Sequence, residues 1–108
     1  MVDQSIEQSV KQYLQAVRQS GIHATRAVLY GSRARGTAGV DSDIDLVVIA
    51  PEFDGQVDRA MVERLWQLRA HTDPRIEPIA CGEAEWAAPL TARVIIEVAH
   101  REGIEIAA

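Results

Sequence analysis

The sequence has little cysteine, few aromatic residues, no long apolar run and no excess of positive charge. Its 108 residues include one cysteine, Cys81, which excludes an internal disulfide and an all-cysteine zinc site. The longest apolar run, residues 46–50, is far shorter than the roughly 20 residues that a membrane-spanning helix needs. No basic stretch followed by an apolar run opens the chain, so we expect no signal peptide and a cytoplasmic location.

Acidic residues outnumber basic ones by 16 to 11, which gives a net charge of −5. A general nucleic-acid binder carries the opposite sign, because contacts with phosphates drive its affinity, so we expect no direct nucleic-acid binding. Apolar residues make up 47% and charged residues 25%, a composition typical of a folded globular domain. The length fits one domain, over residues 1–108.

Short apolar segments with two different periodicities alternate along the chain. Helical spacing and breaker residues predict helices at 6–17, 57–68 and 91–102, a helical turn at 83–87, and strands at 27–30, 44–50 and 75–81. Residues 104–106 form either a last short strand or a docked tail. Pro78 cannot donate a ladder hydrogen bond, which predicts either an edge position or a bulge for its strand. This order predicts an α/β (α+β) fold, a small mixed sheet with helices mainly on one face.

The strand around residues 46–49 is apolar on both of its faces. Strands of this kind are normally covered on both sides. The predicted helices suffice for one side, so we expect a partner chain to cover part of the other.

Two aspartates stand at the entrance of this strand. Asp43 and Asp45 are two residues apart, so their carboxylates point to the same face. Like charges so close resist ionisation unless a cation neutralises them, and Mg²⁺ favours one or two carboxylates together with substrate phosphates. A bare Asp-x-Asp also occurs in solvated turns.

The segment before them, residues 31–36, has the sequence GSRARG and follows a predicted strand. Gly31 allows close approach of the backbone, and the Ser32 hydroxyl adds a donor at the start of a short helix. Arg33 and Arg35 offer charge-assisted contacts to phosphate. Each feature alone is weak, but together they place a phosphate cradle beside a metal site.

This combination resembles the minimal nucleotidyltransferases of the DNA polymerase beta superfamily. The resemblance implies the polymerase-beta-like nucleotidyltransferase fold. It implies that Gly31 and Ser32 hold the triphosphate of ATP, and that Asp43 and Asp45 hold the metals, with two Mg²⁺ ions expected. It covers most of the chain, from about Val28 to Ile104.

The resemblance also implies a third carboxylate on a later strand, which completes the metal site and helps to activate the acceptor hydroxyl. Glu77 is the candidate because it lies in the only other plausible strand. Many members carry aspartate there, so the glutamate departs from the commoner pattern. The alternative for Glu77 is a surface residue on an edge strand, and Glu83 and Glu85 are poorer candidates.

Stand-alone members of this family are often paired with a helical HEPN toxin. The resemblance implies that the chain acts as an antitoxin by transferring AMP from ATP to a tyrosine of that toxin, in a hetero-oligomer. Three alternatives stay open: an antitoxin or regulatory subunit that neutralises its partner by binding alone, an enzyme that modifies a small molecule, for which a homodimer would have to build the pocket, and, least favoured, a polymerase.

Overall fold

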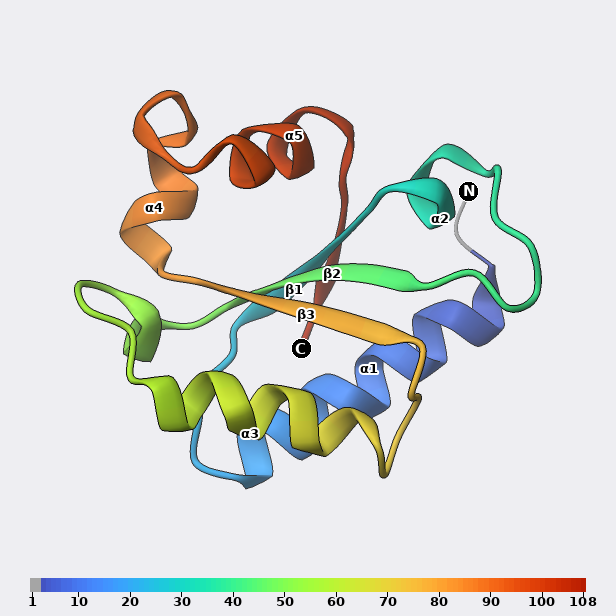
Figure 1. The fold of residues 1–108 in the computed structure, drawn as a ribbon, viewed down its shortest axis with the longest axis horizontal. Coiled ribbons are helices and arrows are strands. Elements are labelled where there is room, and N and C mark those ends of the chain that lie inside the picture. The colour runs from blue at the N-terminus through green and yellow to red at the C-terminus, as the bar shows by residue number, and fades with distance from the viewer. Residues whose placement is uncertain (1–2) are drawn as a thin grey trace.

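A computed structural model describes residues 3–108 of the chain. The elements alternate as the sequence predicts (Figure 1), with two short 3₁₀ turns between them. In chain order they are α1 (Gln4–Gln19), β1 (Arg26–Tyr30), α2 (Ser32–Arg35), β2 (Ile44–Ile49), η1 (Pro51–Phe53), α3 (Arg59–Arg69), β3 (Ile76–Cys81), α4 (Glu83–Ala87), η2 (Pro89–Thr91), α5 (Val94–Glu102) and β4 (Ile104–Ala107).

The four strands form one mixed sheet in the order β3-β2-β1-β4. Strand β1 is antiparallel to both β2 and β4, whereas β2 and β3 are parallel. The strand that contains Pro78 therefore lies at an edge, as the missing backbone donor predicts. The C-terminal residues form a strand rather than a docked tail. The α+β fold class predicted from the sequence is confirmed.

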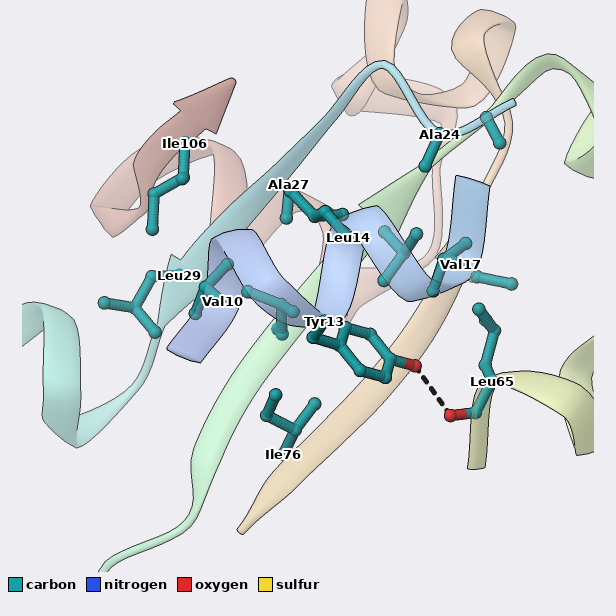
Figure 2. Close-up of a cluster of buried hydrophobic side chains, with 14 of the residues drawn as sticks. Val10, Tyr13, Leu14, Val17, Ala24, Ala27, Leu29, Leu65, Ile76 and Ile106 are labelled. Carbon is teal, nitrogen blue, oxygen red and sulfur yellow. Dashed lines mark hydrogen bonds between the residues drawn. The ribbon is translucent and has the colours of Figure 1, made fainter. Parts of the chain in front are cut away.

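One face of the sheet packs against the two longest helices, α1 and α3 (Figure 1). Helix α1 starts where Asp3 accepts a hydrogen bond from the Ser5 amide, and its apolar stripe faces the strands. Tyr13 joins the two helices, since its hydroxyl donates to the Leu65 carbonyl at 2.6 Å (Figure 2). The core on this face contains Ile6, Val10, Leu14, Val17, Ala27, Leu29, Ile44, Leu46, Val48, Leu65 and Ile76.

The opposite face packs against α4 and α5 (Figure 1). Its core contains Val28, Tyr30, Val47, Ile49, Cys81, Trp86, Ile96 and Ala99. The expectation that a partner chain covers this face of β2 is therefore corrected: Val47 and Ile49 are fully buried beneath helices of the same chain. The two short helices after β3, α4 and α5, pack on this second face of the sheet instead of joining α1 and α3 on the first.

None of the helices in residues 3–108 combines the length and the apolar character that crossing a bilayer requires.

Candidate active site

The candidate site begins where β1 ends, at the turn formed by Gly31 and Ser32. Gly31 has a φ of +74°, a conformation that favours glycine. A Cβ at this position would collide with the Asp45 carboxylate, so the backbone of the turn lies directly against that side chain. Helix α2 then starts at Ser32 and ends after one turn at Gly36, which adopts the left-handed conformation. The sequence-predicted turn and short helix are thus both present, next to one of the two predicted aspartates.

Strand pairing brings the three predicted carboxylates to the same end of the sheet. Asp45 pairs with Tyr30 of β1 on one side and with Glu77 of β3 on the other. Adjacent strands lie about 4.8 Å apart, so Glu77 and Asp45 are neighbours across the parallel ladder. Asp43 precedes β2 by one residue and shares the face of Asp45. These side chains lie on the sheet face that α4 and α5 cover farther along.

The electrostatics of the site reflect this crowding of negative charge. Burial and then the neighbouring Asp43 raise the pKa of the Asp45 carboxyl, while Arg35 acts in the opposite direction. Burial and then the charges of Asp43 and Asp45 raise the pKa of Glu77. Burial, with the charges of Asp45 and Glu77, raises the pKa of the Tyr30 hydroxyl to about 12. Each shift signals that additional negative charge is unfavourable here and that a cation would be stabilised.

The donor set fits a hard divalent cation such as Mg²⁺. All three side chains offer carboxylate oxygens, the ligand type that this ion prefers. Within residues 3–108, no three acidic, histidine or cysteine side chains converge into a ready-made metal site. One or two carboxylates with water and substrate phosphates are the usual ligands of Mg²⁺ at phosphoryl-transfer sites, and Asp43 and Asp45 supply that number.

The two predicted phosphate ligands of α2 point to different neighbours. Arg35 Nη1 lies 3.2 Å from Glu102 Oε1, and its charge also acts on Asp45. Arg33 Nη2 instead donates to the carbonyl oxygens of Val40 and Ser42, in the loop that leads to β2. The charge of Arg35 therefore reaches the Asp45 carboxyl, whereas Arg33 holds the loop before β2 through hydrogen bonds. A phosphate contact from Arg33 stays a prediction.

Glu102 is a site residue that the sequence pattern did not indicate. Its Oε1 accepts hydrogen bonds from the Gly31 amide at 3.1 Å and from Arg35. It ends α5 two residues before Ile104, which pairs with Leu29, so the ladder between β4 and β1 places it beside Gly31. Only that pairing identifies the residue, because a lone glutamate before a glycine carries no specific signal.

Comparisons with known proteins agree with this geometry. No curated protein sequence matches the chain. Among solved structures, a toxin-antitoxin with AMP-PNP is similar at a TM-score of 0.61 and 20% identity, over 93% of this chain and 71% of that one. A Sulfolobus solfataricus protein assigned as a nucleotidyltransferase is similar at a TM-score of 0.61 and 19% identity, over 92% and 77% of the two chains. At these identities the likeness shows the fold.

A sequence model described as a nucleotidyltransferase domain matches residues 10–88. This range is most of the chain and contains the Gly31-Ser32 turn, both aspartates and Glu77. The chain therefore belongs to the nucleotidyltransferase domain family.

Proposed function

We propose that the chain transfers a nucleoside monophosphate, AMP from ATP, to a hydroxyl acceptor in an Mg²⁺-dependent reaction. The observation that carries the proposal is the close approach of the glycine turn to the Asp45 carboxylate. Gly31 lies against the Asp45 carboxylate, and Glu77 is the partner of Asp45 in the adjacent strand. A triphosphate bound at the turn would therefore lie next to the residues that hold its metal.

Each residue has a distinct role in this proposal. Asp43 and Asp45, with Glu77, hold two Mg²⁺ ions, which when bound neutralise charge on the phosphates. The Gly31-Ser32 turn binds the β and γ phosphates. Arg35 stabilises the negative charge that develops during transfer, because its charge already acts on the Asp45 carboxyl.

The reaction exchanges one bond to phosphorus for another. The acceptor oxygen bonds to the α-phosphorus, the bond from that phosphorus to the bridging oxygen breaks, and pyrophosphate leaves. Glu77, assisted by Asp45, accepts the proton of the acceptor hydroxyl.

We propose a tyrosine of a HEPN-type toxin as the acceptor, so that the chain acts as an antitoxin in the cytoplasm, where ATP is available. The support is the fold shared with a toxin-antitoxin structure that contains AMP-PNP. A partner that presents its own hydroxyl at the open end of the sheet would complete the site.

The test uses α-labelled ATP with Mg²⁺ in a lysate of source cells in which the co-encoded partner is shown to be present. Wild-type chain is compared with the Asp43→Asn/Asp45→Asn double variant. We expect a labelled macromolecule with the wild type and a roughly 100-fold weaker signal with the variant, since oriented charge at the reacting centre supplies factors of this size. Asp41→Asn, an exposed change of the same kind in the adjacent loop, is the matched control. Full transfer by the double variant would exclude the mechanism.

A second function is an antitoxin that neutralises its partner by binding alone. One observation favours it: the Gly31 amide and Arg35, two donors expected to meet phosphate, are both bound to Glu102. Binding of ATP with and without Mg²⁺ separates the two functions. A pure binding module neutralises its partner whether or not it binds Mg²⁺-ATP, and its double variant stays fully active as an antitoxin.

A further inference from the structure

The loop at residues 36–43 carries the first metal aspartate but has little apolar packing of its own. Val40 at its tip is 82% exposed. The loop lines a surface pocket of about 310 Å³. The start of α1 and the residues Arg33 and Arg75 line the same pocket. Polar contacts rather than burial must therefore hold this segment in place.

Arg33 holds the loop from the side of α2. Its Nη2 atom donates to the Val40 carbonyl at 3.2 Å and to the Ser42 carbonyl at 2.8 Å. Within the loop, the Gly39 amide donates to the Ser42 hydroxyl at 2.8 Å and the Ser42 amide to the Gly39 carbonyl at 3.2 Å. The residue directly before Asp43 is thus fixed by its carbonyl, its amide and its side chain.

Arg75 holds the same loop from the side of β3. Its Nη1 atom donates to the Val40 carbonyl at 2.9 Å, and its own carbonyl accepts the Ile44 amide at 2.9 Å. The guanidinium is itself oriented by a two-point pair with Asp73, at 3.0 Å from Nε to Oδ1 and 2.7 Å from Nη2 to Oδ2. Asp73 is 7% exposed and also accepts the Arg75 amide.

These contacts bracket Asp43 on both sides of its own main chain. The Val40 and Ser42 carbonyls are fixed before it and the Ile44 amide after it. Because Arg75 stands two residues before Glu77, the same residue ties the loop to the strand that carries the third carboxylate.

We infer that Arg75, oriented by Asp73 and assisted by Arg33, is a positioning residue that sets the Asp43 carboxylate relative to Asp45 and Glu77. The inference rests on the proposed function, since it assigns these residues to the metal site of the same reaction. It gives the Asp73-Arg75 pair, which no motif singles out, a role in metal binding without direct contact with the ion.

The first measurement is the affinity of the nucleotide-free protein for Mn²⁺, monitored by electron paramagnetic resonance. Residues that orient metal ligands typically change metal affinity about 10- to 100-fold. We expect Arg75→Ala to weaken Mn²⁺ binding about 10-fold. Arg75→Lys should fall between that variant and the wild type, because lysine can reach one carbonyl but cannot form the two-point pair. Arg59→Ala removes an arginine from an exposed pair with Glu63 and should bind like the wild type.

The second measurement is the Mg²⁺ dependence of transfer at saturating ATP. Arg75→Ala should need about 10-fold more Mg²⁺ for half-maximal rate, while the KM for ATP at saturating Mg²⁺ should stay within about 2-fold. Circular dichroism and the melting temperature show whether the variant is folded, and Arg75→Lys supplies the milder change if Arg75→Ala is not.

The outcomes separate this inference from the proposed function. If the wild type binds Mn²⁺ and loses it in Asp43→Asn, while folded Arg75 variants bind as the wild type does, the positioning role is overturned and the metal site stands. If the wild type binds no Mn²⁺ either alone or in the presence of ATP, the proposed metal site fails and the positioning role fails with it. A higher KM for ATP with unchanged metal dependence would also overturn the inference, because it would indicate a phosphate contact.

Discussion

At Gly31, two independent constraints exclude a side chain. The φ of +74° with a ψ of −150° is a conformation that essentially only glycine adopts, and a Cβ would collide with the Asp45 carboxylate. Gly36, at the other end of α2, has a φ of +76°, but a Cβ there would meet no atom of residues 3–108 within 4 Å. The two glycines therefore share a positive φ but differ in ψ, −150° at Gly31 and 19° at Gly36, and in the contact that a Cβ would make.

This contrast gives a matched pair of variants. We expect Gly36→Ala to lower the free energy of unfolding by about 1–2 kcal/mol, because alanine can enter the left-handed helical region only at this cost. Gly31→Ala should lower it by more, because the ψ of −150° at Gly31 is essentially closed to other residues. Only Gly31→Ala should also displace the Asp45 carboxylate, and it should lower the rate of transfer about 10-fold or more. Urea denaturation and the α-labelled ATP assay measure the two effects. Equal activity of the two folded variants would contradict the role of this contact.

The two arginines of α2 show that residue type alone does not determine which groups a side chain contacts. Arg33 and Arg35 are both basic, two residues apart and equally plausible as phosphate ligands from the sequence. In the structure one donates to loop carbonyls and the other pairs with Glu102. The difference arises because successive residues of a short helix point in different directions, and the neighbours in those directions come from distant segments.

Among the elements, the junction between α5 and β4 contacts the turn after β1. Glu102 is the last residue of α5, and it accepts the Gly31 amide and Arg35 through one oxygen. A triphosphate at the turn would compete with this carboxylate for Arg35.

Glu102→Gln tests that competition. Glutamine keeps a carbonyl oxygen for the Gly31 amide but removes the negative charge beside Arg35. Exposed ion pairs contribute up to about 1 kcal/mol, so we expect the KM for ATP to fall up to about 5-fold. Steady-state kinetics at saturating Mg²⁺ measure it, with Glu105→Gln as a control because Glu105 pairs with Arg26 away from the turn. An unchanged or higher KM would show that the carboxylate does not compete with phosphate.

The order and type of the elements were predictable from local patterns. The helical stripe of α1, the glycine after β1 and the proline in β3 each act through their own backbone or their near neighbours in sequence. The coverage of the second sheet face was not predictable in this way. It depends on where α4 and α5 turn after β3, which the apolar pattern of a short helix does not specify.

For the whole molecule, the acidic residues have opposite effects on stability. Asp73 is stabilised as a carboxylate by hydrogen bonds from Arg75, which lower its pKa to about 2. It therefore stabilises the fold above its unfolded pKa, and this contribution is lost as the pH falls towards about 2. Asp45 has a raised pKa, mainly from burial and Asp43, so its ionised form destabilises the metal-free fold at neutral pH.

We therefore expect Asp45→Asn to be more stable than the wild type at pH 7 in the presence of EDTA. The sign follows because the folded state binds the Asp45 proton more tightly than the unfolded state does. The destabilisation is fully present above the raised pKa and disappears as the pH falls through it. Urea denaturation at pH 7 and pH 4 measures the difference in free energy of unfolding, with Asp41→Asn as the control. This account would be contradicted if the variant were less stable than the wild type at pH 7. It would also be contradicted if the difference in free energy of unfolding between the two proteins were not smaller at pH 4.

Local sequence was enough to specify the elements, the glycine-serine turn, the spacing of Asp43 and Asp45, and an α+β fold class. These features depend on backbone freedom and on periodicities of two or about four residues, which involve only near neighbours in the chain. Tertiary packing was needed to place Glu77 across from Asp45, to bring Glu102 to Gly31, and to let Arg75 hold the loop before Asp43. Each of these contacts joins residues more than 30 positions apart. Strand register and the packing of helices on the sheet, rather than local preference, determine which distant side chains meet.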